Sequence, residues 1–140
     1  MNTRERREFV RSHRIAVFGY KRRDHGPAMT VVYYVMDGDD ILISTMTERA
    51  KAKAVTRDPK VSLCILDEKW PPTYLLVYGT ATIVTDFETV VDLRMRIAGL
   101  MAEQPIPESN RPDIAETTRR EKRVMLRIKP YMTFESPPRH

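Results

Sequence analysis

The segment from Met29 to Met36 constrains the fold more than any other part of the sequence, because it is apolar or aromatic on both faces of one predicted strand. One face carries Met29, Val31, Tyr33 and Val35, and the other carries Val32, Tyr34 and Met36. An antiparallel strand with one solvated face alternates apolar with polar residues instead. We therefore expect one face to join the core and the other to meet another subunit or a ligand. A homodimer is the preferred account, because two-fold dimers are the commonest soluble assembly.

Turn-rich segments on both sides of this strand predict β-hairpins. Residues 21–27 separate it from an apolar stretch over Ile15–Tyr20, and Asp37–Asp40 separates it from Ile41–Thr45. The Asp37-Gly38 pair suits a tight hairpin turn, because glycine readily adopts a positive φ. Further strands are predicted over Val61–Leu66, Tyr74–Val84, Arg123–Ile128 and Tyr131–Phe134, and in the longest of them Leu75, Val77, Gly79, Ala81 and Ile83 form the face that suits a core.

Helical periodicity is present in four other segments. They run from Thr3 to about His13, from Glu48 to Asp58, from Asp86 to about Glu103 and from Arg111 to Glu121, with Thr3 and Asp86 as the expected N-caps. Short strands joined by hairpins, with one helix between strands and others near the ends, predict an α+β, mainly antiparallel barrel or sandwich. The 140 residues fit a single domain over residues 1–140, with 136–140 as a frayed tail.

Several classes of protein and site are excluded by the sequence. It has no apolar run near the ~18 residues of a membrane span, and its charged N-terminal segment is unlike a secretory signal, so we expect a cytoplasmic protein. The single cysteine, Cys64, lies in an apolar segment and is expected to be a buried small hydrophobic residue. His13, His25 and His140 are far apart and lack the short spacings of a zinc site, so no metal is expected.

The stretch from Ser44 to Arg57 carries the clearest chemical signal. The hydroxyls of Ser44, Thr45 and Thr47 lead into a predicted helix start, which is followed by Arg49, Lys51, Lys53 and Arg57. Unpaired N–H groups and the helix dipole favour a phosphate at such a start, where arginine supplies a planar fork and lysine a point charge. The net charge of +5 agrees with an anionic partner. The alternative is an ordinary solvated helix face, and composition and spacing leave both interpretations open.

Four segments in this order resemble a known group of proteins. They are residues 9–17, residues 26–34, residues 44–51 and residues 57–63, and the most specific part is Arg49-Ala50-Lys51 followed by Arg-Asp-Pro-Lys-Val-Ser at 57–62. The sequence resembles the pyridoxamine-phosphate-oxidase-like split β-barrel superfamily and, within it, the flavin/deazaflavin oxidoreductases that use coenzyme F420. The resemblance covers roughly residues 5–85 and, more loosely, residues 122–134.

The resemblance implies a cofactor that lies across the interface of a homodimer. Its phosphate would be held by Ser44, Thr45, Arg49 and Lys51, with a further hydroxyl from Thr47, and its ring would be lined by Thr30, Val31, Val32 and Tyr33. Lys53, Arg57 and Lys60 are candidates for the acidic tail of F420. Trp70, Tyr74, Leu76 and Tyr78 would approach from the partner subunit, or else serve in ordinary packing of the dimer interface.

The reaction that the resemblance implies is hydride transfer from reduced F420 to an activated double bond of a small organic substrate. The cofactor supplies the difficult chemistry, so no catalytic residue is assigned, and Tyr33, Tyr78 or water would deliver the proton. Ala54 stands where many relatives carry Asn, which weakens the choice between F420 and FMN, although Arg49-Ala50-Lys51 favours F420. An FMN-binding flavoprotein is the first alternative. A non-enzymatic module that binds a cofactor or nucleic acid is the second, although no nucleic-acid-binding motif is present.

Overall fold

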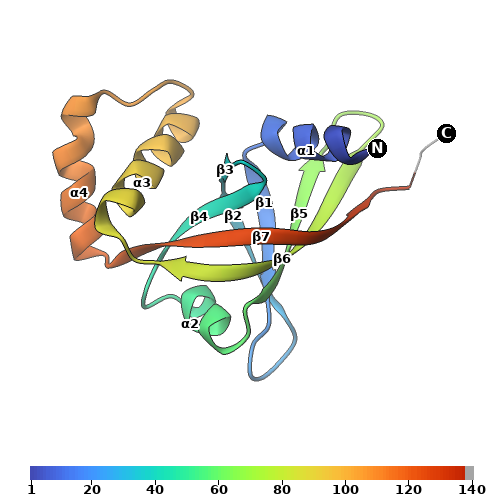
Figure 1. The fold of residues 1–140 in the computed structure, drawn as a ribbon, viewed down its shortest axis with the longest axis horizontal. Helices are drawn as coiled ribbons and strands as arrows, with labels where there is room; N and C mark the ends of the chain where they lie inside the picture. The colour runs from blue at the N-terminus through green and yellow to red at the C-terminus, as the bar shows by residue number, and fades with distance from the viewer. Residues whose placement is uncertain (138–140) are drawn as a thin grey trace.

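A curled antiparallel sheet forms the centre of the computed structural model, which describes residues 1–137 (Figure 1). Within these residues it has seven strands in the order β2-β1-β5-β6-β7-β4-β3, and every neighbouring pair is antiparallel. The strands are β1 (Ile15–Tyr20), β2 (Ala28–Tyr33), β3 (Val35–Asp37), β4 (Asp40–Met46), β5 (Lys60–Asp67), β6 (Thr73–Val84) and β7 (Arg123–Glu135). This half-barrel confirms the predicted α+β, mainly antiparallel fold.

The helices surround the sheet. They are α1 (Thr3–Ser12), α2 (Ala50–Arg57), α3 (Phe87–Ala102) and α4 (Arg111–Arg120), with the short 3-10 helix η1 (Glu108–Asn110) before α4. Figure 1 shows α1 and α2 at opposite sides of the curled sheet, and α3 and α4 together beside its β4 end. No helix in residues 1–137 is both long enough and apolar enough to cross a membrane.

The inner face of the curled sheet holds the main core. Phe18, Ile43, Ile65, Leu75 and Leu126 are among its fully buried side chains. A smaller core lies under α3, where Val90, Leu93 and Ile97 pack on Val35, Leu42 and Met125. The prediction that Ile83 faces the core is wrong: it is 38% exposed, because Ala81 is the last residue of β6 that the core covers.

The segment Met29–Met36 is divided between the two edges of the sheet. The single predicted strand is wrong, because the chain leaves β2 at Tyr34 and continues as β3 on the opposite edge. Tyr34 fixes this break: its N–H donates to the Arg14 carbonyl at 3.0 Å, and its hydroxyl donates to the Val10 carbonyl at 2.6 Å. Burial of the ring raises the pKa of Tyr34, so the hydroxyl stays protonated as a donor.

The two longest strands, β6 and β7, approach each other closely at Gly79. A Cβ atom on Gly79 would lie 2.6 Å from Ile128 Cγ2 and 2.8 Å from the Lys129 carbonyl oxygen, so only glycine allows β7 to approach this closely. The register shifts at the same place, between Tyr78 and Gly79. Beyond this bulge β7 continues to Glu135, so residues 131–134 are not the separate strand that was predicted.

The predicted ends of the helices are confirmed only in part. Asp86 caps α3 as predicted, since its carboxylate accepts from the Thr89 N–H at 3.1 Å. The N-cap of α1 is Asn2 and not Thr3, because Asn2 and Glu5 form a reciprocal capping box. The helix predicted from Glu48 begins at Ala50, with Arg49 as its N-cap. The predicted frayed tail at 136–140 lies largely outside the described residues.

Candidate functional site

The candidate site lies where β4 ends and α2 begins. β3 pairs only with residues 40–42 of β4, so the second half of β4 has β7 on one side and an open edge on the other. The turn after β4 is tied to the start of β7, because both the N–H and the hydroxyl of Thr47 donate to the Lys122 carbonyl, at 2.9 and 2.8 Å. The Thr47 hydroxyl therefore anchors the turn.

A cavity of about 380 Å³ occupies this open edge. Its lining combines hydroxyls and cations from four strands and the start of α2: Tyr20, Thr30, Ser44, Thr45, Met46, Arg49, Ala50, Lys51 and Arg123. Five residues predicted for the cofactor site are thus brought together, namely Thr30, Ser44, Thr45, Arg49 and Lys51. Lys51 Nζ already donates to Thr30 Oγ1 at 3.2 Å, which joins α2 to β2.

Two hydroxyls in this lining are buried without a partner. Among the described residues, neither Ser44 Oγ nor Thr45 Oγ1 has a hydrogen bond, and Thr45 is only 2% exposed. An unsatisfied buried polar group costs about 1–3 kcal/mol, so such groups call for an explanation. A phosphate oxygen in the cavity would supply the missing acceptor.

The positive charge of the cavity is only partly balanced within the chain. In residues 1–137, Arg49 and Lys51 form no ion pair with a carboxylate. The first turn of α2 carries no acidic residue, and no side chain caps it. Burial, and then the neighbouring Arg49 and Arg123, lower the pKa of Lys51, because each disfavours its charged form. A bound anion would favour the charged form of Lys51 and so oppose this lowering of its pKa.

Sequence reasoning missed Arg123. This residue is the first of β7 and stands opposite Met46 of β4, which places its side chain at the cavity. Its guanidinium also donates to Glu121, at 3.3 and 3.4 Å. No local motif marks Arg123, because its position depends on a pairing between strands that are far apart in the sequence.

A second cavity of about 280 Å³ adjoins the first and shares Ser44, Lys51 and Arg123 with it. Its other lining residues are Val31, Val32 and Tyr33 from β2, and Arg94, Ile97, Ala98 and Met101 from α3. Arg94 is fixed by hydrogen bonds to Thr118 Oγ1 at 2.7 Å and Thr117 Oγ1 at 3.0 Å. The residues predicted to line a ring therefore lie next to those predicted to hold a phosphate.

Other predicted site residues lie outside both cavities of this chain. Lys53 and Arg57 are exposed on α2, and Trp70, which is 80% exposed, lies in the turn between β5 and β6 at the far side of the sheet from α2 (Figure 1). Tyr74 and Tyr78 are on β6 and also line neither cavity. Ala54 packs in the main core and lines neither cavity.

The outer face of the sheet carries an exposed apolar stripe. The registers align Val31, Val17, Cys64, Leu76 and Phe134 as one row across five strands. Val31 is 70% exposed, and Met29 in the next row is 73% exposed. The prediction that Cys64 is buried is therefore wrong: it is half-buried, because it points to this open face. Such a patch is typical of an interaction surface.

A curled antiparallel half-barrel, here with a cavity lined by hydroxyls and cations at the end of β4, is the fold of the split β-barrel proteins. The chain belongs to the pyridoxamine 5'-phosphate oxidase family, whose family model matches residues 3–132. A comparison with curated proteins gave no match.

Solved structures share this fold. A conserved hypothetical protein from Mycobacterium tuberculosis is 24% identical with a TM-score of 0.84, over 96% of this chain and 84% of that one. A structure named F420 reductase is 20% identical with a TM-score of 0.68, over 86% and 89% of the two chains. An FAD-binding protein from Mesorhizobium loti is 14% identical with a TM-score of 0.69, over 96% and 92%.

Proposed function

We propose that the protein is an F420-dependent oxidoreductase, which transfers a hydride from reduced deazaflavin to an activated double bond of a small organic substrate. One observation carries the cofactor site: Ser44 and Thr45, whose buried hydroxyls have no partner among the described residues, line one cavity with Arg49 and Lys51. Hydroxyl donors and cations that lack a carboxylate partner suit a phosphate group. The F420 reductase among the similar folds supports the choice of cofactor.

The residues of this chain divide the work between the two cavities. Arg49 and Lys51 would bind the phosphate, with Ser44 and Thr45 as donors and Arg123 as a further cation. Val31, Val32 and Tyr33 would then position the ring in the adjoining cavity, where Ile97 and Met101 exclude water. The deazaflavin supplies the hydride, and holding the two reactants in contact is the main contribution of the protein.

The apolar outer face supports a homodimer as the working unit. Val17, Met29 and Val31 are exposed on β1 and β2, next to the second cavity that Val31 also lines. A two-fold interface over this face would bury these side chains, and it would bring Trp70, Tyr74 or Tyr78 of the second copy toward the ring. Lys53, Arg57 and Lys60 would remain available for the acidic tail of F420.

FMN is the alternative cofactor, because it presents a similar ribityl phosphate to the same residues. The FAD-binding protein among the similar folds favours keeping this alternative. A nucleic-acid-binding role has no comparable support, since the sequence carries no nucleic-acid-binding motif.

Anaerobic turnover distinguishes these proposals. Reduced F420 or reduced FMN would be mixed with the protein and cyclohexenone, and the return of the oxidised cofactor would be followed by its absorbance. The proposal predicts protein-dependent oxidation of reduced F420 only when the enone is present. Oxidation of reduced FMN alone would assign the protein to the flavin branch, and no turnover with either would contradict an enone reductase.

A further inference from the structure

The face of α1 that lies over the sheet is unusually polar. Thr3, Arg6, Arg7 and Val10 recur at the spacing of one helix face, and only Val10 among them is buried. A helix that packs closely on a sheet presents apolar side chains at these positions. The N-terminal half of α1 instead leaves a space above the sheet, which we call the α1 groove.

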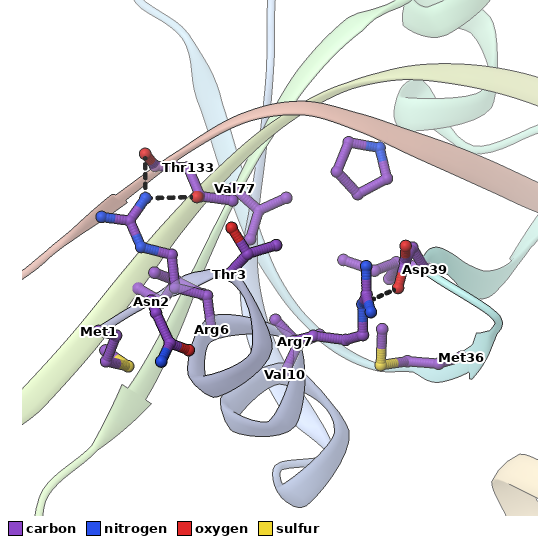
Figure 2. A pocket seen from close by; sticks show the side chains of 13 residues that line it. Met1, Asn2, Thr3, Arg6, Arg7, Val10, Met36, Asp39, Val77 and Thr133 are labelled. Atoms are coloured by element: carbon purple, nitrogen blue, oxygen red, sulfur yellow. Dashed lines mark hydrogen bonds and ion pairs between the residues drawn. The ribbon is translucent and has the colours of Figure 1, made fainter.

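The α1 groove has a volume of about 510 Å³ and shares no lining residue with either cofactor cavity. Its sheet side is apolar, with Met36, Ile41, Leu75, Val77 and Pro130 in the lining. Its α1 side carries the two arginines, which Figure 2 shows on opposite sides of the groove. A space of this size accommodates a small organic molecule.

The two arginines differ in how fully they are paired. Arg6 donates through Nη1 to the carbonyl and hydroxyl of Thr133, at 3.0 and 2.8 Å, and through Nη2 to Glu135 at 3.0 Å. Its Nε is buried and has no acceptor within residues 1–137. Arg7 pairs with Asp39 across the other side of the groove, where both side chains are largely exposed (Figure 2). Solvent screens that pair, so an incoming anion can compete for Arg7.

The cations on the α1 side of the groove are only partly engaged by acceptors. Arg6 Nε has no acceptor among the described residues, and the Arg7–Asp39 pair is exposed to solvent. An apolar wall opposite a buried unpaired donor and an arginine in a solvent-screened pair matches a molecule with one carboxylate and an apolar body.

We propose that the α1 groove is a second ligand site, separate from the cofactor site, for a small amphipathic carboxylate. The carboxylate accepts from Arg6 Nε and is attracted by Arg7, and the apolar body lies along Met36 and Pro130. The site is independent of the proposed cofactor chemistry, because α1 lines neither cofactor cavity.

The first test is a titration of the full chain, labelled with ¹³C in the methionine methyl groups, with octanoate and with octanamide as its uncharged analogue. Met36 lines the α1 groove, Met46 and Met101 line the cofactor cavities, and Met29 is on the outer face. Octanoate should shift the Met36 signal in a saturable way and leave the other three unchanged, and octanamide should bind roughly tenfold more weakly. Equal binding of octanamide, an unmoved Met36 signal or a shift of Met29 instead would overturn the proposal.

Two variants complete the test. Arg6→Gln removes the unpaired donor and should abolish the response to octanoate while leaving FMN and F420 binding unchanged. Thr3 is exposed and lines the groove, so Thr3→Trp would place a bulky side chain there. This variant should also abolish the response to octanoate, although it removes no charge. Because Arg6 also holds Thr133 and Glu135, the fold of each variant is checked by circular dichroism. Wild-type affinity for octanoate in folded Arg6→Gln, or in Thr3→Trp, would overturn the proposal.

Discussion

Cations from other elements lie beside both ends of β4, but among the described residues Arg127 at the first end is paired with carboxylates, whereas Arg49 and Lys51 at the second end are not. At the first end, Arg127 donates to Asp40 at 2.6 Å and to Asp37 at 2.5 Å, and its hydrogen bond to Asp37 lowers the pKa of that carboxyl. At the other end, Arg49 and Lys51 have no carboxylate partner in the described chain, and two hydroxyls beside them are unsatisfied. The first end is complete within the protein. The second end leaves these two hydroxyls without partners among the described residues, and this difference is why we propose it as the functional end.

We expect the largest effect from a new carboxylate beside Arg49 and Lys51, because it would remove the difference between the two ends of β4. Ala50 is exposed, lines the cavity and is the first residue of α2, so Ala50→Glu would place a negative charge beside Arg49 and Lys51. We expect about a 100-fold loss of FMN and F420 affinity, measured by fluorescence titration, while the helix dipole keeps α2 stable. Ala50→Gln has nearly the same shape, so an equal loss in that variant would show that size and not charge is responsible.

Removing a cation from either end should give different losses. Lys51→Ala should weaken cofactor binding by about 1–3 kcal/mol, which is about 5- to 150-fold, because a charge-assisted hydrogen bond is lost. Arg127→Met should leave that affinity unchanged and lower the thermal midpoint, because Asp37 and Asp40 lose their partner. Calorimetry and titration of both variants measure the two effects. Weaker cofactor binding in Arg127→Met would contradict the separation of the two ends.

Deletion of one buried hydroxyl should affect stability and binding in opposite senses. Thr45→Val removes an unsatisfied group and should raise the free energy of unfolding of the cofactor-free protein by about 1 kcal/mol, with a several-fold loss of phosphate affinity. Thr118 is equally buried but is hydrogen-bonded to Arg94 and to the Ile114 carbonyl, so Thr118→Val should lower stability. Chemical denaturation of the two variants measures this contrast, and a destabilised Thr45→Val would show that its hydroxyl is already satisfied.

The smallest expected effect is on the pH dependence of binding. Because burial and two arginines lower the pKa of Lys51, its ammonium loses its proton at a lower pH than an ordinary lysine. Cofactor affinity should therefore decrease as the pH rises through that lowered pKa, since the neutral amine no longer attracts the phosphate. Lys51→Arg should flatten the profile, because arginine stays charged. An identical decrease in Lys51→Arg would assign the titration to another group.

Local sequence patterns predicted most of the elements and part of the site. Three features depend only on residues that are close in sequence, and the sequence predicted each of them. They are the Asp37-Gly38 turn, the Asp86 cap, and the hydroxyl and cation pattern from Ser44 to Lys51. Arg123 was missed because only the pairing of β4 with β7 places it there.

The break between β2 and β3 could not be predicted from local sequence patterns either. The chain changes from β2 to β3 at Tyr34 because that residue hydrogen-bonds to the Val10 and Arg14 carbonyls of a distant segment. The apolar pattern of Met29–Met36 is the same whether the segment is one strand or two. The homodimer and the approach of Trp70, Tyr74 and Tyr78 remain predictions.

The most direct test of the account is a side-by-side titration of the purified protein with F420 and FMN, following cofactor and Trp70 fluorescence. It would be carried out on the wild type, on Lys51→Ala and on Lys129→Ala, which removes an exposed lysine from β7 outside both cavities. The account predicts tight binding of F420, weak binding of FMN, and loss of affinity in Lys51→Ala alone. Equal affinities in all three proteins, or binding of neither cofactor, would contradict the phosphate site at the end of β4.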